Sequence, residues 1–330
     1  MMAASVDPLL LLAAALAVDA VFGDMPAIFR HIPHPVVLAG RAIAFFDRKL
    51  NRPARSEASR RERGIITVVI LGGGAALLGL IVQRLCRGSL LGAAAEILIT
   101  ATLLAQRSLF EHVAAVGRAL DRSGLAGGRE AVRHIVGRDA MSLDRYGVVR
   151  AAIESLAENF SDGVVALAFW YLLLGLPGLF AYKMINTLDS MIGHRTPRYR
   201  SFGWAAARLD DVLNAVPAPL SGLFLAAAAI FTKDSRAGHA LRIMLRDGRK
   251  HHSPNAGWPE SAMAGALGLA LAGPRRYSEG VVADTWLGDG TARATTADIV
   301  RALQLYRFAC LVQGGLLLGA WLAAHFTLPV

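Results

Sequence analysis

The chain has 330 residues, of which 54% are hydrophobic and 18% are charged, and its formal net charge is +10. An ordinary soluble domain carries about 25% charged residues, so this composition excludes a typical soluble domain and indicates a protein embedded in lipid. The positive charge does not indicate nucleic-acid binding, because no nucleic-acid module is recognisable and most basic residues lie between apolar segments.

Six apolar segments are candidates for membrane-spanning helices, since crossing the hydrocarbon core takes ~20 helical residues. Four lack Asp, Glu, Lys and Arg: residues 65–83, 163–182, 212–232 and 308–330. Two weaker ones, residues 9–22 and 90–105, contain Asp19 and Glu96. A carboxylate at mid-membrane costs roughly 2.5 to 3.5 kcal/mol, so Glu96 is expected to face other helices.

The basic residues set the expected orientation. Residues 24–64 carry nine Lys and Arg against four acids, which places this loop in the cytoplasm by the positive-inside rule. A simple crossing at residues 163–182 would put the five basic residues of 183–211 outside. The Gly175-Leu176-Pro177-Gly178 break and the Pro217/Pro219 pair therefore indicate broken or re-entrant helices, which are allowed where protein satisfies the freed backbone.

The whole chain, residues 1–330, is predicted to be one all-α, polytopic membrane domain. We expect about four to six transmembrane helices, re-entrant or interfacial helices, and polar segments in the cytoplasm. No internal repeat is visible, and residues 52–63 are expected to be the most mobile stretch because they are charged and nearly free of large apolar side chains.

The first polar cluster lies just before the apolar run that begins at residue 163, and membrane topology does not explain it. Glu154, Glu158 and Asp162 recur at i, i+4 and i+8, so a helix would place three carboxylates on one face. Such a face suits Mg²⁺, which takes oxygen ligands and often bridges to phosphate, or acid/base work. The alternative is a solvated amphipathic helix whose acids pair with arginines such as Arg150.

Two further clusters follow. Asn186, Asp189, Ser190 and Gly193 form a polar stripe at helical spacing, with a gap at Gly193 that a ligand or a helix could approach. The alternative reading of this stripe is a polar seam between helices. Arg208, Asp210, Asp211 and Asn214 then bring acids and an amide within about one turn at the mouth of an apolar run, where paired acids are usually ligands or ion-pair partners.

The last cluster precedes a helix rich in Ala, Gly and Leu. Asn255 and Glu260 flank Pro259, which fits the first position of that helix. Free N–H groups there would form an anion site, although an ordinary helix start explains the same pattern. No GxxxxGK[ST] motif is present, so any nucleotide is held by something other than a P-loop.

In this order the motifs resemble the adenosylcobinamide-phosphate synthase family of cobalamin biosynthesis, the CobD/CbiB membrane proteins. The matching stretches are VDAVFGD (18–24), HP (34–35), ESLAENFSDGVVA (154–166), YKMINTLDSMIGHR (182–195), ARLDDVLNAVPAPL (207–220) and SPNAGWPESAMAGAL (253–267). They cover the chain nearly end to end. One departure is Met25, where the family tends to place proline directly after Gly-Asp.

The resemblance implies a ligase. A propionate carboxylate of adenosylcobyric acid would be joined, at the expense of ATP, to (R)-1-amino-2-propanol or its O-phosphate, giving adenosylcobinamide or its phosphate. ATP and Mg²⁺ are the implied cofactors, and the corrinoid cobalt is expected to arrive only within the substrate. The resemblance implies a multi-pass protein of the cell (inner) membrane that contacts lipid and whose active site faces the cytoplasm. Other enzymes of the cobalamin pathway are candidate partners.

Under this resemblance the polar clusters take the following expected roles. Glu154, Glu158, Asp162 and Asp189 are candidate catalytic groups, and with Asp211 they are candidate Mg²⁺ ligands. Substrate or phosphate binding is expected of Asn159, Lys183, Asn186, Ser190, Arg195, Arg208, Asp210, Asp211, Asn214, Asn255 and Glu260, with arginine offering a bidentate fork to phosphate.

A transporter or a signalling protein without catalysis is the alternative. Intramembrane acids such as Glu96 and broken helices also occur along solute pathways. A carrier should, however, gather its polar groups at mid-span between repeated halves, whereas here they cluster at segment ends and in loops. The sequence therefore favours the ligase.

Overall fold

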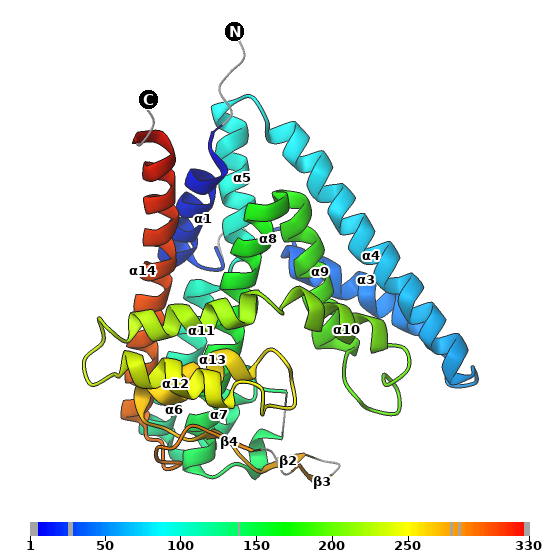
Figure 1. The fold of residues 1–330 in the computed structure, drawn as a ribbon. Helices are drawn as coiled ribbons and strands as arrows, with labels where there is room; N and C mark the ends of the chain where they lie inside the picture. The colour runs from blue at the N-terminus through cyan, green and yellow to red at the C-terminus, as the bar shows by residue number, and fades with distance from the viewer. Residues whose placement is uncertain (1–5, 26–28, 138, 278–279, 283–284, 327–330) are drawn as a thin grey trace. The chain divides into compact units, whose positions relative to one another are not determined.

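The computed structural model describes residues 6–25, 29–137, 139–277, 280–282 and 285–326. The fold is almost entirely helical, with two short β-pairs, as expected for an all-α protein (Figure 1). Contacts divide the chain into two compact units that alternate along the sequence. The first comprises residues 1–105, 166–214 and 321–330, and the second comprises residues 106–165 and 215–320. That residues 1–330 behave as one domain stays a prediction.

The first unit is built from seven helices in the described part of the chain. These are α1 (Pro8–Phe22), α3 (Pro35–Leu50), α4 (Glu57–Cys86), α5 (Leu90–Leu103), α8 (Ala166–Leu174), α9 (Leu176–Ile192) and α10 (Trp204–Leu213). Helix α9 packs along α4 and also contacts α3, α8 and α10, whereas α1 packs against α5 and α8. Helix α9 is therefore the central element of this unit.

The second unit begins with α6 (Gln106–Val132), which is kinked at Gly124, where φ is 64°. The 3₁₀ turn Ala140–Ser142, α7 (Arg145–Phe160), a π-helical turn (Ser161–Val165), α11 (Pro217–Ala228), α12 (Ala237–Asp247) and α13 (Gly257–Leu267) follow. Two antiparallel pairs join β1 (Leu271–Ala272) to β4 (Trp286–Leu287) and β2 (Arg275–Tyr277) to β3 (Gly280–Val282). Helix α14 (Thr296–Phe326) continues from this unit into the first.

Helices long and apolar enough to cross a membrane confirm a membrane protein. Within the described residues three pass by length and composition, Glu57–Cys86, Leu90–Val132 and Thr296–Phe326, or four if α10 and α11 form one broken span. The count reaches the low end of the expected four to six only if this bent pair is one span. On α4, Val69 is 64% and Leu77 is 59% exposed, which suits a lipid-facing surface.

A buried carboxylate of the first unit has a hydrogen-bond partner within the protein. Glu96 is buried on α5, and its Oε1 accepts a hydrogen bond of 2.8 Å from the hydroxyl of Tyr171 on α8. The expectation that Glu96 faces other helices is confirmed. Pairing a carboxylate with a buried hydroxyl offsets part of the cost of removing it from water.

The expected helix breaks are present, and part of the stretch expected to be mobile is helical. Gly175 separates α8 from α9 with φ 68°, a value that glycine adopts readily, and α10 ends before Pro217 opens α11. Residues 57–63 are the first two turns of α4 instead of a loose segment, because Ser56 caps the helix and Arg60 Nε donates to Asn51 Oδ1 at 2.8 Å. Local hydrogen bonds thus order a stretch with little apolar surface.

Candidate functional site

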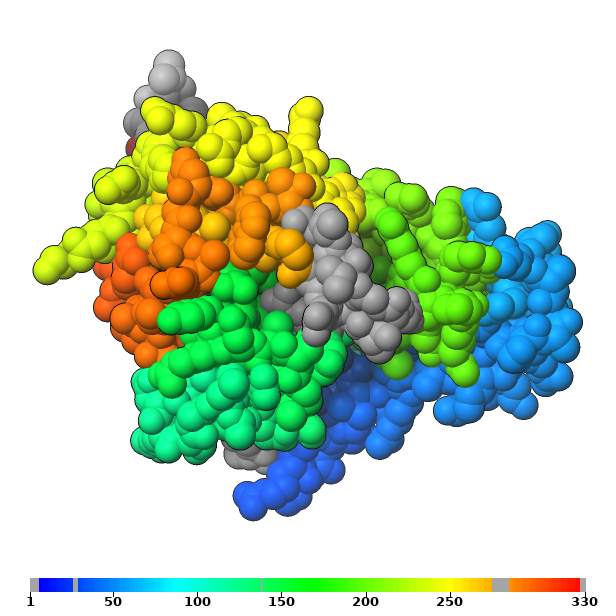
Figure 2. Space-filling model, turned by 90° about the horizontal axis from the view of Figure 1, so that it is seen from below, coloured from blue at the N-terminus to red at the C-terminus, as the bar shows by residue number. Residues whose placement is uncertain are grey.

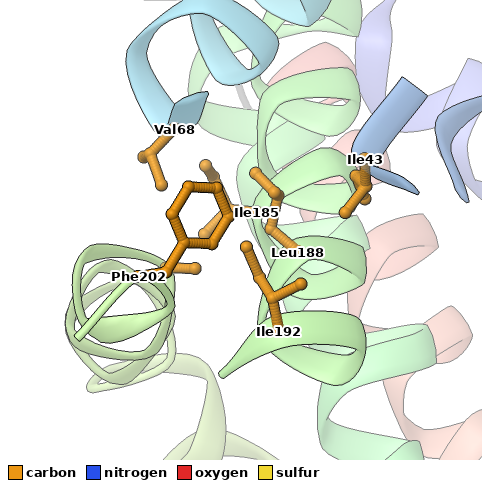
Figure 3. Packing of buried hydrophobic residues seen from close by; sticks show 7 residues of the cluster. Ile43, Val68, Ile185, Leu188, Ile192 and Phe202 are labelled. Atoms are coloured by element: carbon orange, nitrogen blue, oxygen red, sulfur yellow. The ribbon is translucent and has the colours of Figure 1, made fainter. Parts of the chain in front are cut away.

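Helix α9 is held in place by a buried apolar cluster. Ile185, Leu188 and Ile192 lie on one face of α9 and pack against Val68 of α4 and Phe202, with Ile43 of α3 on the other side (Figure 3). All of these side chains are almost completely shielded from solvent. The cluster fixes the rotation of α9 and so decides where its polar stripe points.

The polar stripe meets α10 at a buried carboxylate. Asp210, in the last turn of α10, accepts from the Asn186 side-chain amide at 3.4 Å and from the Asn214 amide at 3.0 Å, one on each carboxylate oxygen. The Tyr182 hydroxyl donates to Asn214 Oδ1 at 2.9 Å. The structure thus brings together three residues predicted from sequence, and it adds Tyr182, whose role no spacing pattern indicated.

Asp189 lies about one turn beyond Asn186 on α9, close enough to Asp210 and Asp211 for the charges to interact. Burial and then the negative charge of Asp211 raise the pKa of Asp189, whereas nearby His194 lowers it. Asp211 is half-buried and forms an ion pair with Arg208, with Arg208 Nη1 and Asp211 Oδ2 3.4 Å apart. Two acids whose negative charges lie close together in a partly desolvated site are suited to proton transfer or to binding a cation.

A small basic cavity adjoins this acidic group. Its volume is about 150 Å³, and it is lined by Gly193, His194, Arg195, Arg200, Trp204, Ala207, Arg208 and Asp211. Three guanidinium groups around so small a space suit a phosphate group, which arginine binds with paired N–H donors. Arg195 and Arg208 were predicted as phosphate partners, whereas Arg200 was missed because nothing in the local sequence distinguishes it.

The loop that carries Arg195 and Arg200 is pinned to α3 and α4. Arg198 Nη2 and the buried carboxylate of Asp47 are 2.6 Å apart, and Asn51 Nδ2 donates to the carbonyl of Arg198 at 3.2 Å. Arg60 also donates to this carbonyl. The contacts with α3 and α4 therefore hold the rim of the cavity in place. The cavity itself is lined by the end of α9, the following loop and α10.

Other predicted residues of α9 take separate positions. Lys183 lines a different, larger cavity, and the Ser190 hydroxyl donates to the Asn186 carbonyl at 2.9 Å. The gap predicted at Gly193 is filled from within α9, because a Cβ atom there would collide with the Asp189 carboxylate. This glycine therefore permits the close approach that shapes the acidic group.

In the second unit, the three acids Glu154, Glu158 and Asp162 lie in different environments. Glu154 is buried, and its Oε1 accepts from the backbone N–H of Ala272 at 2.8 Å. Glu158 is exposed, and Asp162 lies on the π-helical turn, where the register leaves that of an α-helix. The expected single face of three carboxylates is wrong in this respect, because one acid points into the fold. π-Turns are often found at functional sites.

The remaining predicted residues of this unit are mostly buried. Asn159 donates from its side chain to the Ser155 carbonyl at 2.9 Å. Asn255 is buried, and its backbone N–H donates to Ser253 Oγ at 3.3 Å. Glu260 is buried with its Oε1 3.9 Å from His251 Nε2. Helix α13 starts at Gly257, so Pro259 occupies the third helical position and the prediction that it is the first is wrong.

No three His, Cys, Asp or Glu side chains gather closely enough to hold a metal ion within the part of the chain that the structure describes. Mg²⁺ usually binds proteins through one or two carboxylates and takes its other ligands from water and substrate phosphates. Asp189 and Asp211 fit that pattern, beside a cavity suited to phosphate. The arrangement therefore suits a cation that enters with its phosphate ligand.

Comparison with known proteins decides the family. The family model described as CobD/Cbib protein matches residues 12–306. This chain belongs to the CobD/CbiB family. A protein named cobalamin biosynthesis protein CobD from Sinorhizobium sp is 50% identical to this family member over 313 residues, covering 94% of this chain and 97% of that protein.

Two further relatives of this CobD/CbiB protein carry the same name. The one from Brucella anthropi is 50% identical over 315 residues, covering 94% of this chain and 96% of the relative. The one from Rhodobacter capsulatus is 46% identical over 295 residues, covering 89% and 91%. No solved structure matches the chain. The resemblance inferred from the motifs is confirmed at the level of the family.

Proposed function

We propose that this CobD/CbiB protein acts in cobalamin biosynthesis as a ligase on a corrinoid substrate. It would join (R)-1-amino-2-propanol or its O-phosphate to a propionate carboxylate of adenosylcobyric acid, with ATP as the energy source. The observation that carries the proposal is the acidic group of Asp189, Asp210 and Asp211 beside the arginine-lined cavity, in a chain whose close relatives are named for this pathway.

Amide formation from a carboxylate needs an activated acyl group, because a carboxylate is a poor acyl donor. ATP would supply the phosphoryl group and Mg²⁺ would offset its charge. Arg195, Arg200 and Arg208 line the small cavity and would bind phosphate oxygens, although Arg200 is also paired with Glu57. Asp189 and Asp211 offer the oxygen ligands that a phosphate-bound Mg²⁺ accepts.

The bond changes assign a second task to the same acids. The amine nitrogen attacks the acyl carbon of the acyl phosphate, a C–N bond forms, the C–O bond to phosphate breaks, and one proton must leave the nitrogen. A carboxylate within this group accepts that proton. Of the three acids, the one that does not bind the cation would take this role.

We further propose that the protein lies in the cell (inner) membrane with the site facing the cytoplasm. The basic residues at 24–64 and 183–211 support this orientation. Adenosylcobyric acid, aminopropanol or its phosphate, and ATP would then reach the site from the same side, where other enzymes of the pathway could deliver them.

The test is conversion of adenosylcobyric acid by the purified full-length protein in lipid nanodiscs. ATP, Mg²⁺ and either aminopropanol or its phosphate are supplied separately, and amide product and ADP are measured. Amide with stoichiometric ADP is the expected result, and the preferred amine identifies the substrate. Absence of product from both amines, with correctly folded protein, would refute the ligase.

Two variants connect the activity to the site. Asp189→Asn and Arg208→Gln are each expected to lower kcat/KM by about 10²-fold or more, since removing a positioned proton acceptor or phosphate ligand costs rates of this order. Arg48→Gln changes an exposed arginine of α3 and is the matched control. If either site variant retained full activity, that residue would be removed from the mechanism.

A transport function is less well supported. A carrier gathers its polar groups at mid-span, whereas Asp189 and Asp210 each lie in the last turn of a helix. The buried Glu96 is bonded to Tyr171 and needs no solute to satisfy it.

A further inference from the structure

The first two turns of α4 lie outside its apolar stretch and belong to a segment with an excess of positive charge. The run without charged residues extends over residues 65–83, a length that suits the ~30 Å hydrocarbon core of a bilayer. Residues 52–63, which precede this run, contain five arginines and two glutamates. Clusters of about four to eight cations directly beside a spanning helix are typical of surfaces that attract anionic lipid headgroups.

Arg60 and Arg61 are adjacent on α4, but they are used differently. Arg60 donates from Nε to Asn51 Oδ1 at 2.8 Å and from Nη2 to the carbonyl of Arg198, so its donors serve the protein. Arg61 is exposed and, within the part of the chain that the structure describes, forms no hydrogen bond or ion pair. Its guanidinium carbon instead lies 3.6 Å from the centre of the Trp204 ring. Arg61 therefore has N–H donors to offer to a ligand.

Trp204 gives Arg61 a fixed support. It begins α10, which packs against α4 (Figure 1), and it is 38% exposed. The segment before it approaches α4 closely at Gly64, where a Cβ atom would collide with the backbone oxygen of Phe202, and the Phe202 side chain is buried in the apolar cluster. An arginine stacked on an aromatic ring is restricted in position while its N–H groups stay available to an anion.

The height of this pair along α4 matches the headgroup layer of a bilayer. Arg61 precedes Ile65, the first residue of the apolar run, by four residues, so its Cα atom lies at most ~6 Å outside the hydrocarbon core. Headgroups occupy about 5–7 Å on each side of that core, and tryptophan is enriched at this level. Ile65 and Ile66 are exposed, as suits a surface that faces lipid. Arg61 would thus meet lipid phosphates.

The charge around the pair selects the class of headgroup. Five cations against two acids over residues 52–63 favour a headgroup with a net negative charge and disfavour one whose phosphate is balanced by an ammonium group. Trp204 also lines the small basic cavity, whereas Arg61 does not. A headgroup at Arg61 therefore adjoins the proposed catalytic site and uses none of the residues assigned to catalysis.

We propose that Arg61, held against Trp204, binds the phosphate of an anionic phospholipid such as phosphatidylglycerol. The occupant is a lipid because the pair stands at the end of an exposed apolar surface on a spanning helix. It is anionic because the surrounding segment is basic. The inference goes beyond the ligase reaction and does not depend on it.

The test uses the full-length protein in phosphatidylcholine nanodiscs that contain increasing fractions of phosphatidylglycerol, with bromine on the acyl chains of one lipid or of the other. Brominated chains quench nearby tryptophans, and the difference between the wild-type protein and Trp204→Phe isolates the signal of Trp204. We expect phosphatidylglycerol to be preferred at Trp204 by about fivefold, as for one arginine near a charged membrane surface. Equal quenching by the two lipids would refute the proposal and favour an acidic protein segment as the occupant.

Arg61→Gln removes the charge and the paired donors, and it is expected to abolish the preference. Its melting temperature in pure phosphatidylcholine is expected to change little, because the described contacts of Arg61 include no hydrogen bond within the protein. Arg87→Gln, at an exposed position at the other end of α4, is the matched control and is expected to keep the preference. A preference that persists in a folded Arg61→Gln protein would overturn the assignment.

Inorganic phosphate distinguishes a lipid from a free anion. Added at millimolar concentration to the wild-type protein, it is expected to leave the preference for phosphatidylglycerol nearly unchanged. If it abolished the preference, the pair would bind a phosphate ion and the lipid proposal would fail. These measurements need no ATP or corrinoid, so their outcome and that of the ligase assay are independent.

Discussion

Glu154 shows how the environment of one residue changes its expected role. The sequence grouped it with Glu158 and Asp162, but the structure buries it and joins its Oε1 to the N–H of Ala272. Ala272 has φ 58°, an unfavourable conformation for a residue with a Cβ atom. Glu154 thus holds a strained backbone position between α7 and β1.

This contact predicts a difference between two substitutions. Glu154→Gln keeps a carbonyl oxygen that can accept from Ala272, so the thermal stability and the ligase activity are expected to change little. Glu154→Ala leaves the buried N–H without this acceptor and is expected to cost about 1–3 kcal/mol. Thermal unfolding in detergent measures both, and complete loss of activity in a stable Glu154→Gln protein would restore the catalytic role predicted from sequence.

Asp247 is a buried carboxylate of the second unit with several hydrogen-bond donors. It accepts from Arg246 Nη2 at 2.6 Å, from Lys250 Nζ at 2.6 Å and from the backbone N–H of Gly288 at 2.9 Å. Figure 2 shows the yellow segment of α12 beside the orange segment that contains Gly288. Burial alone would raise the pKa of Asp247, but these hydrogen bonds hold it well below its usual value.

The lowered pKa of Asp247 predicts how stability depends on pH. The unfolded carboxyl binds its proton near pH 3.9, whereas the folded one binds it only at lower pH, so its contribution is complete above about pH 4 and is lost as pH falls further. Asp247→Asn is expected to lower the stability by about 2 kcal/mol at pH 7 and to flatten the acid limb of a Tm-against-pH curve. Asp234→Asn, at an exposed position, is the control, and equal effects of the two would contradict this role of Asp247.

The close contact between helices α4 and α9 requires a residue without a side chain at Gly79. A Cβ atom at Gly79 would lie 2.6 Å from the backbone oxygen of Leu176, whereas Gly74, on the same helix, has nothing within 4 Å of such an atom. Gly79 therefore permits the close packing that small residues provide between membrane helices.

The two glycines form a matched pair. Gly79→Ala must displace α9, and we expect a loss of about 1–3 kcal/mol together with reduced activity, because α9 carries Asp189. Gly74→Ala adds a methyl group in open space and is expected to leave both unchanged. Comparison of the melting temperatures and kcat values of the two variants tests this, and a Gly79→Ala protein as stable and active as Gly74→Ala would show that the contact has no such importance.

For the whole molecule, the basic loops predict an orientation that labelling can test. In a protein with Cys86→Ala and Cys310→Ser, single cysteines are placed at the exposed positions Ala54 and Arg87, which flank the spanning helix α4. A membrane-impermeant thiol reagent is expected to label Ala54→Cys only in inverted vesicles and Arg87→Cys only in right-side-out vesicles. The reverse pattern would place the proposed site outside the cytoplasm.

The sequence by itself determined the features that depend on local chemistry. Apolar runs of sufficient length identified the helices that suit a membrane, and Gly175 and Pro217 identified two breaks, because backbone conformation restricts these residues directly. The order of the motifs identified the CobD/CbiB family. The spacing of Asn186 and of Asp210 with Asn214 also predicted polar faces that the structure joins.

Only the tertiary structure decided which polar residues meet. Arg200 reaches the basic cavity because Asp47 and Arg60, more than 130 residues earlier, pin the loop before α10. Glu154 leaves its expected face because its partner Ala272 is 118 residues away along the chain. Helical periodicity describes neighbours within one element, whereas burial and pairing depend on which elements pack together, and that information is not local to any segment.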